Sequence, residues 1–193
     1  MKKVLNVGGN NKQIPIPDHY KGWQHDLLDI DASKKPDVVC DAREMTKLPA
    51  GTYDAVYCSH NLEHYWRHDL PRVLKGFAHV LHPDGFVEAI VPDMKAVFVE
   101  MLERKIDIND VLYKSPSGFP ITVNDVIYGW GREIEESGED FFAHKNGFTD
   151  RSLTLALRAH GFEQVFIAYG KLEVSALAFR REPTEEQRKL LFP

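Results

Sequence analysis

Short apolar runs recur through the first half of the chain, and each ends at a glycine, a proline or a polar residue. They occupy residues 4–7, 27–30, 38–40, 53–58 and 86–91. Runs of this length are typical of strands that are buried on both faces of a parallel sheet. The pattern therefore predicts five parallel strands in the first half of the chain.

The clearest helical pattern lies between the fourth and fifth of these runs. Apolar side chains recur there at the 3.6-residue spacing of a helix that packs one face on a sheet, at Val73, Leu74, Phe77, Val80 and Leu81. Asp69 is expected to cap this helix, and residues 82–85 end it with turn chemistry. The crossover after the first strand contains Pro15 and Pro17, so it is expected to be short or irregular.

Beyond residue 93 the periodicity is weaker. A helix is expected over residues 94–104, and residues 105–148 mix glycine, proline, aromatic and acidic positions as an insertion would. A further helix is expected to begin after Thr149, which caps it, and to end at Gly161. Two strands follow as a hairpin, at 163–168 and 173–180, and the polar tail from Glu182 is expected to fray. We therefore expect a single domain over residues 1–193, in which residues 94–148 form a substrate lid.

The composition of the chain argues against several classes of function. The chain has 193 residues, a net charge of −5 and no block rich in lysine or arginine, which argues against nucleic acid or an anionic membrane as a partner. Only two cysteines are present, so a disulfide framework is excluded. The short apolar run at the N-terminus is neither a signal peptide nor a membrane span, and a cytoplasmic location is expected.

Candidate binding residues follow the ends of the predicted strands. In an open parallel sheet, ligands bind beyond the carboxyl ends of the strands, where the strand order reverses. Glycines that permit a sharp turn follow the first strand, and an aspartate suited to ribose hydroxyls follows the second, twenty residues beyond Gly9. The positions after the four strands that bear on the site are Gly8, Gly9, Asp29, Asp41, Ala42, Ser59 and His60.

The stretch 53–64, Tyr-Asp-Ala-Val-Tyr-Cys-Ser-His-Asn-Leu-Glu-His, resembles the class I S-adenosylmethionine-dependent methyltransferases, in particular their small-molecule group called type 11. Members of this group share an aspartate-led strand followed by Leu-Glu-His. Val73-Leu74 and the turn at 82–86 also match the group, as does the acidic end of the second strand. The resemblance covers residues 4–93, about half of the chain.

The resemblance implies a Rossmann-like α/β sandwich, with a seven-stranded, mostly parallel sheet whose last strand is antiparallel. It also implies S-adenosylmethionine as cofactor, bound by Asn6, Gly8, Gly9, Asp29, Asp41, Ala42, Ser59 and His60. The family usually has an acid where Asn6 stands and a glycine where Asn10 stands, and asparagine tolerates the left-handed backbone that such a glycine adopts. The implied reaction is in-line methyl transfer to a small-molecule acceptor.

A hydroxyl or amine acceptor needs a base, and His60, His64 and His144 are the candidates. His144 lies in the aromatic stretch at 141–144, which is expected to roof the pocket. No metal site is predicted. Residues 60–64 also match the His-x-x-Glu-His pattern of zinc peptidases, so a zinc hydrolase using His60, Glu63 and His64 is an alternative. A non-catalytic relative that keeps the fold is a second alternative, and the absent Gly-x-Gly-x-x-Gly spacing disfavours a nicotinamide dehydrogenase.

Overall fold

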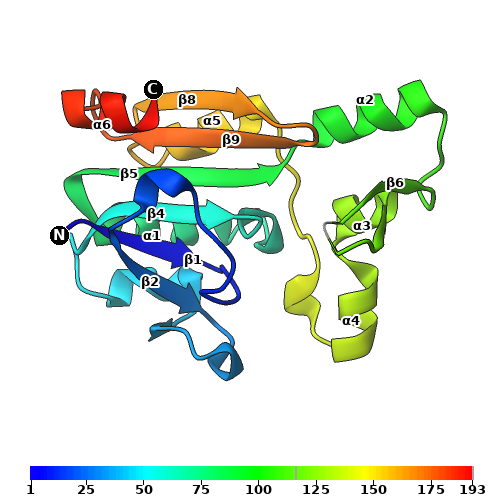
Figure 1. Ribbon diagram of the computed structural model, residues 1–193, viewed down its shortest axis with the longest axis horizontal. Coiled ribbons are helices and arrows are strands. Elements are labelled where there is room, and N and C mark those ends of the chain that lie inside the picture. The colour runs from blue at the N-terminus through cyan, green and yellow to red at the C-terminus, as the bar shows by residue number, and fades with distance from the viewer. Residues whose placement is uncertain (116, 193) are drawn as a thin grey trace.

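The computed structural model describes residues 1–115 and 117–192 and contains a seven-stranded sheet, drawn in Figure 1. The spatial order of the strands is β3-β2-β1-β4-β5-β9-β8. Six of them are mutually parallel, and β9 is antiparallel to its neighbours β5 and β8. Their bounds are β1 Lys3–Val7, β2 Gln24–Asp29, β3 Val38–Val39, β4 Tyr53–Ser59, β5 Leu81–Pro92, β8 Gln164–Tyr169 and β9 Glu173–Phe179. The predicted fold class is confirmed.

The strand order reverses between β1 and β4. β1 pairs with β2 on one side, where Leu5 lies opposite Asp26, and with β4 on the other, where Leu5 lies opposite Val56. The chain therefore leaves β1 toward one edge of the sheet and later returns to extend the other edge. The carboxyl ends of β1 and β4 lie next to each other at this point, which is where open α/β sheets bind ligands.

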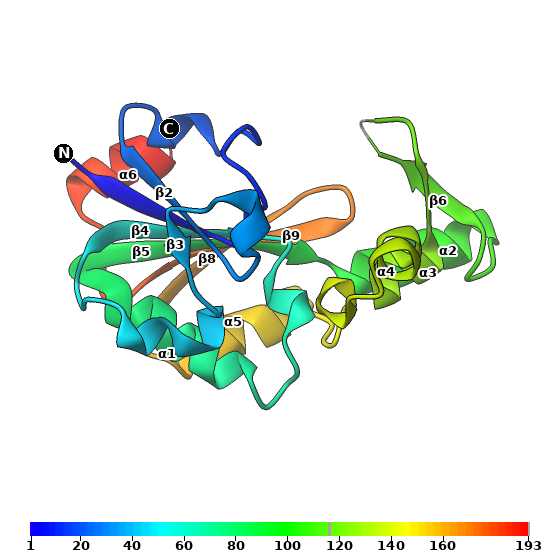
Figure 2. The same cartoon turned by 90° about the horizontal axis from the view of Figure 1, so that it is seen from below.

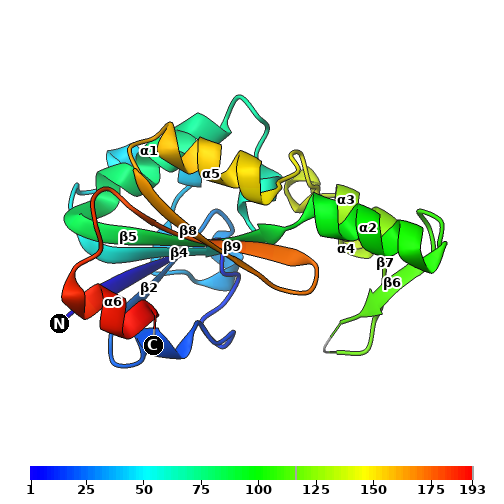
Figure 3. The same cartoon turned by 90° about the horizontal axis from the view of Figure 1, so that it is seen from above.

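One face of the sheet is covered by α1 (Leu70–Val80) and α5 (Asp150–Arg158), which lie side by side in Figures 2 and 3. Phe77, Leu153 and Leu157 are fully buried there against strand residues. Gly76 permits close approach, because a Cβ at this position would lie 2.7 Å from the Met45 side chain in the 3-10 turn at 42–47. This face holds the larger part of the core.

The opposite face carries a smaller, largely aromatic cluster. The crossover between β1 and β2 contributes only the 3-10 turn Asp18–Tyr20, as its prolines predicted. The Tyr20 and Phe86 rings stack with centroids 6.2 Å apart, and Phe179 stacks on Phe86 at 5.4 Å. The helix α6 (Glu185–Leu191) completes this face, as Figure 2 shows.

The helix α6 corrects the prediction that the tail frays. Thr184 and Gln187 form a capping box at its start, and the Gln187 amide also donates a 2.6 Å hydrogen bond to the Asp84 carbonyl. Phe192 packs edge-on against Phe166, with ring centroids 5.0 Å apart. The helix covers only the edge of the aromatic cluster, so it needs few apolar residues. The sequence of this segment is therefore mostly polar.

Two local predictions about the start of α1 and of β5 also need correction. Asp69 precedes α1 but makes no capping bond with its side chain, which is instead turned to Arg43 and Arg72. The expected turn at 82–85 lies within β5 as an exposed bulge, because Leu81 pairs with Tyr53 and the pairing resumes only at Phe86. The predicted helix starting after Thr149 is confirmed, with a capping box between Thr149 and Ser152.

Residues 94–148 form a compact extension beyond the carboxyl ends of β1, β4 and β5, toward which the arrowheads of these strands point in Figure 1. It contains α2 Met94–Arg104, β6 Val111–Lys114, β7 Pro120–Thr122, α3 Val123–Tyr128 and α4 Gly131–Ser137. Val97, Leu112, Val123 and Val126 form its own buried cluster. Phe98 and Leu102 of α2 are exposed, at 47% and 70%. Within residues 1–115 and 117–192, none of the helices has the length and apolar character needed to cross a bilayer.

Candidate active site at the strand switch point

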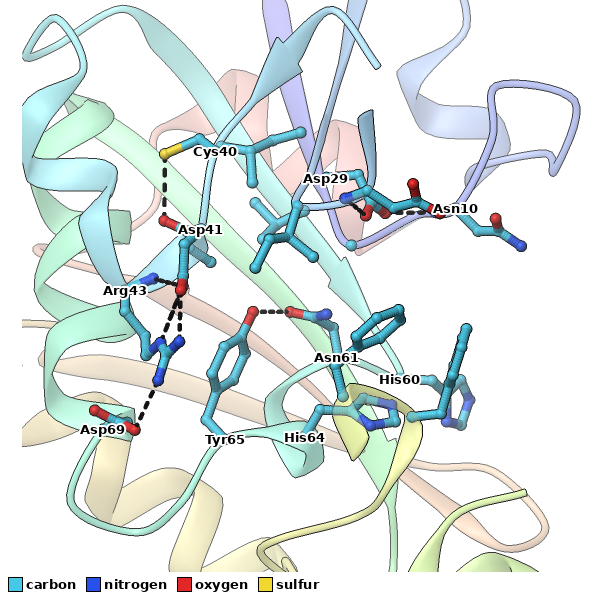
Figure 4. Close-up of a pocket in the computed structure, with 18 of the residues that line it drawn as sticks. Asn10, Asp29, Cys40, Asp41, Arg43, His60, Asn61, His64, Tyr65 and Asp69 are labelled. Atoms are coloured by element: carbon cyan, nitrogen blue, oxygen red, sulfur yellow. Dashed lines mark hydrogen bonds and ion pairs between the residues drawn. The ribbon is translucent and has the colours of Figure 1, made fainter. Parts of the chain in front are cut away.

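A cavity of about 550 Å³ lies at the carboxyl ends of β1, β2 and β4 and is called here the switch-point cavity. Its volume is in the range of sites that hold a small ligand or cofactor. Gly8, Asp29, Asp41, Ala42 and His60 line it, so five of the eight predicted binding positions lie together at one cavity. Figure 4 shows several of its side chains.

The turn after β1 has the backbone that its sequence predicted. Gly8 has a φ of +70° and Asn10 a φ of +61°, both in the left-handed region that glycine adopts freely and asparagine tolerates. A Cβ on Gly9 would lie 2.2 Å from the Asn6 amide nitrogen, so glycine is also required at this position. The loop thus keeps its backbone bare at the rim of the cavity.

Asp29 lies at the end of β2 and faces this loop. Its Oδ1 accepts the Asp31 N–H at 2.9 Å and its Oδ2 the Asn10 N–H at 3.3 Å, and the second of these bonds joins the two loops (Figure 4). A carboxylate has about four lone-pair sites in all, so each oxygen retains capacity for another donor. The side chain is therefore fixed in position and still able to bind hydroxyl groups.

Asp41 is held by Arg43, which follows it by two positions after the third strand. Arg43 Nη2 lies 2.6 Å from Asp41 Oδ2, Arg43 Nε also binds this carboxylate, and Arg43 Nη1 reaches Asp69 Oδ2 at 3.2 Å (Figure 4). Burial raises the pKa of Asp41, but the Arg43 bonds lower it further, so the net pKa lies below the ordinary value. Together the three residues join the end of β3 to the start of α1 along one wall of the cavity.

The other three predicted positions, Asn6, Gly9 and Ser59, do not line the switch-point cavity. Asn6 is buried, with 3% of its surface exposed, and its amide packs under the glycine turn. Its position one residue before the end of β1 directs the side chain beneath the loop.

Several lining residues come from segments that the strand-end rule does not reach. Tyr65 donates a 3.0 Å hydrogen bond to Asn61 Oδ1, and burial raises the pKa of this phenol. Phe141, Phe142 and Lys145 line the cavity from the extension, whereas Ala143 and His144 of the predicted roof do not. Asn61 lies two positions after the end of β4. Its place near a strand end is the feature of the sequence that identifies it as a candidate lining residue.

His60 lies between the switch-point cavity and a second cavity of about 670 Å³, called here the outer cavity, and lines both. Its backbone has a φ of +50°, and its Nε2 lies 3.3 Å from Glu173 Oε2. Partial burial lowers the pKa of this imidazole, but Glu63 and Glu173 raise it further, so the net pKa lies above the ordinary value.

The outer cavity lies between the extension and the ends of β5 and β9. Tyr113, Trp130 and His144 reach it from the extension, while Pro92 and Glu173 reach it from the sheet. Burial raises the pKa of Tyr113 and lowers that of His144. The cavity therefore has aromatic walls, a neutral imidazole and a carboxylate next to His60.

His64 and His144 lie close together, with ring centroids 4.8 Å apart, although eighty residues separate them in the sequence. His60 points elsewhere, toward Glu173. Residues 62–64 form a single 3-10 turn, so His60 and His64 do not share a helical face as they do in the zinc-peptidase motif. The alternative of a zinc hydrolase built on His60, Glu63 and His64 is therefore not supported by this geometry.

Comparison with known proteins agrees with the fold. A family described as a methyltransferase domain matches residues 24–89. A SAM-dependent methyltransferase from Archaeoglobus fulgidus superposes with a TM-score of 0.58 at 16% identity, covering 92% of this chain and 86% of that one. A possible histamine N-methyltransferase from Thermotoga maritima gives 0.55 at 14% identity, covering 94% and 83%.

A third similar structure holds ligands. It is 1,6-didemethyltoxoflavin-N1-methyltransferase of Burkholderia thailandensis with 1,6-didemethyltoxoflavin and S-adenosylhomocysteine bound, at a TM-score of 0.54 and 15% identity, covering 93% of this chain and 71% of that one. No curated protein matches this chain significantly. These findings agree with the resemblance seen in the sequence: residues 24–89 match a methyltransferase domain, and the fold is that of S-adenosylmethionine-dependent methyltransferases.

Proposed function

We propose that this protein transfers a methyl group from S-adenosylmethionine to a small-molecule acceptor, with the cofactor in the switch-point cavity and the acceptor in the outer cavity. The observation that carries this proposal is that two adjoining cavities share His60. A two-substrate transfer needs two such sites next to each other, so that the reacting atoms are held in line.

Residues at the switch-point cavity fit the parts of the cofactor. Asp29 has free acceptor capacity for the ribose hydroxyls, and the bare backbone at Gly8 permits close approach of the ligand. The wall at Asp41 and Ala42 is suited to the adenine, with Arg43 fixing the Asp41 side chain. Lys145, whose side chain is 14% exposed, offers a cation for the carboxylate of the methionine part.

The cofactor supplies an electrophilic methyl group on a sulfonium, which passes in line to a nucleophilic atom of the acceptor. The protein residues then have two tasks. The roof at 141–145 excludes water from the switch-point cavity, and His60 accepts the proton that an amine or hydroxyl acceptor loses. His60 is preferred to His64 and His144 as the base because it alone of the three lines both cavities.

The size and walls of the outer cavity favour a small acceptor with an aromatic or flat apolar part. Tyr113 and Trp130 supply the aromatic surface, and residues 94–148 form the lid that closes over it. The Burkholderia methyltransferase with its bound 1,6-didemethyltoxoflavin shows that this fold can accommodate such a compound. Cys40 and Cys58 are free thiols, which fits the proposal that the enzyme works in the cytoplasm.

Two measurements test this function. Calorimetry with S-adenosylmethionine and S-adenosylhomocysteine is expected to show one site for either ligand, and methyl-labelled cofactor incubated with a panel of aromatic amines and phenols is expected to label at least one of them. NAD serves as the negative control ligand. The absence of binding by either adenosyl compound would overturn the proposal, and binding without transfer to any small molecule would count against a small-molecule acceptor.

A further inference from the structure

Glu63 is a buried carboxylate without an adequate partner. Only 2% of the residue is exposed, and neither carboxylate oxygen accepts a hydrogen bond from any residue that the structure describes. His60 Nδ1 lies 3.5 Å from Oε1, too far for a good hydrogen bond. Leaving a charged carboxylate buried in this way is costly unless a cation compensates it.

Two imidazoles face this carboxylate. One ligand atom from each of Glu63, His64 and His144 lies within 4.8 Å of the other two. His64 Nδ1 lies 3.1 Å from the Ala143 carbonyl, and His144 Nδ1 lies 2.9 Å from the Val126 carbonyl. A carbonyl can only accept, so each Nδ1 carries a proton, and Nε2 is the nitrogen of each ring that is left to bind a metal ion.

This arrangement brings a buried carboxylate and two imidazoles together, with His60 Nδ1 at 3.5 Å as the nearest other polar group given for the carboxylate. A histidine that binds a metal through one nitrogen typically donates its other N–H to a backbone carbonyl, which fixes its tautomer and orientation. Both histidines meet that condition here. The backbone around them is also fixed, because the Glu63 carbonyl accepts N–H bonds from Lys145 at 2.7 Å and Asn146 at 3.0 Å.

We propose that Glu63, His64 and His144 bind a divalent metal ion of the zinc type. Two neutral imidazoles and one carboxylate are the ligand set of zinc sites that keep a fourth position open, and this set favours zinc over magnesium, which prefers oxygen ligands. The pattern within residues 60–64 suggested His60 as the second imidazole, but the fold supplies His144 from the extension instead.

The position of this site gives it a role distinct from hydrolysis. His64 lines the switch-point cavity, whereas Glu63 and His144 line the outer cavity, so the ion lies between the two. The site joins the turn after β4 to the extension, and two of its three ligands line the outer cavity. The ion is thus placed to hold the extension closed and to bind an oxygen or nitrogen of the acceptor.

The test uses the full-length protein after chelator treatment and dialysis, titrated with ZnCl₂ and separately with MgCl₂ in a calorimeter. Wild type is expected to bind one Zn²⁺ and to show a higher Tm with it. Glu63→Gln, which nearly preserves the shape of the side chain, and His144→Ala are each expected to bind Zn²⁺ more than about 100-fold more weakly. His82→Ala is the matched control, because His82 is exposed at the opposite end of the sheet.

Zn²⁺ binding that is unchanged in Glu63→Gln and His144→Ala would overturn the proposal, as would no stoichiometric binding by wild type or a preference for Mg²⁺. Circular dichroism and the Tm of each metal-free variant show whether it is folded before titration. Metal binding is measured here without S-adenosylmethionine, so failure of this inference and failure of the proposed methyl transfer are observed in separate experiments.

Discussion

A Cβ placed on Gly8 would lie 2.1 Å from the Asn61 amide nitrogen. The turn after β1 and the turn after β4 therefore meet at the switch point with room for only one side chain, and that side chain is Asn61. Asn61 Oδ1 is in turn held by the Tyr65 hydroxyl at 3.0 Å. The position of the glycine loop thus depends on the segment that carried the strongest family resemblance.

Gly8→Ala is expected to destabilise the protein by about 2–4 kcal/mol, from the strain of a left-handed alanine and the displacement of Asn61. Urea denaturation measures this loss. Gly22→Ala is the matched control, because Gly22 has a φ of +85° but a Cβ there would meet nothing within 4 Å. Gly22→Ala is therefore expected to destabilise the protein by only about 1–2 kcal/mol, from the strain of a left-handed alanine without crowding. Equal losses in the two variants would show that crowding by Asn61 is unimportant.

Asp29→Ala is expected to weaken S-adenosylmethionine binding about 10- to 150-fold, the loss that corresponds to about 1.5–3 kcal/mol for hydrogen bonds to a charged group. The loss has two sources, since Asp29 would bind the ribose and its Oδ2 also holds the Asn10 N–H. Calorimetry measures the affinity. Asp84→Ala, which removes an exposed carboxylate far from the cavity, should bind like wild type; unchanged affinity in Asp29→Ala contradicts the assigned pocket.

Arg43→Met is expected to destabilise the protein by about 1–2 kcal/mol at pH 7, because it leaves Asp41 and the buried Asp69 without their shared cation. The figure is reduced for solvent screening, since the Arg43 side chain is 38% exposed. Arg188→Met is the control: its pair with Glu182 is exposed, and a loss below about 0.5 kcal/mol is expected.

The Arg43 effect also has a defined pH dependence. The pKa of Asp41 is lower in the folded protein than its ordinary value, so its contribution to stability is complete above the unfolded pKa of about 3.9 and is lost as the pH falls through the folded pKa. The gap between wild type and Arg43→Met in urea denaturation should therefore narrow below about pH 4. A gap that persists undiminished at pH 2.5 would show that Asp41 is not the group stabilised by Arg43.

The sequence allowed the sheet to be predicted because buried parallel strands are short apolar runs, and because the residues that follow them share one edge. Gly8, Asp29 and Ala42 were found by this rule alone. The rule fails for contacts that depend on packing. Nothing in the sequence pairs Arg43 with Asp69, twenty-six residues away, or His64 with His144. The family resemblance adds Asn6 to the site, and the side chain of Asn6 lies beneath the loop.

The boundaries of strands and helices were harder to predict where apolar residues do not recur at a regular spacing. β2 begins at Gln24, three residues before its apolar run, because Lys3 and Val4 of β1 pair with polar residues there. The hairpin of β6 and β7 was not predicted, since Val111, Tyr113 and Phe119 are about 40% exposed and the hairpin packs on the rest of the extension through Leu112. Tertiary contacts, rather than propensity, determine these elements.

His60 provides the most direct test of the catalytic arrangement. Because it lines both cavities, His60→Asn is expected to lower kcat about 10²- to 10⁴-fold with an acceptor identified by the labelling screen, while the KM for that acceptor changes little. S-adenosylmethionine affinity, measured by calorimetry, should stay within about threefold. His82→Ala should retain wild-type turnover. A variant that loses cofactor affinity in parallel with kcat would identify His60 as a binding residue, and one that keeps its full kcat would mean that the acceptor proton leaves by another route.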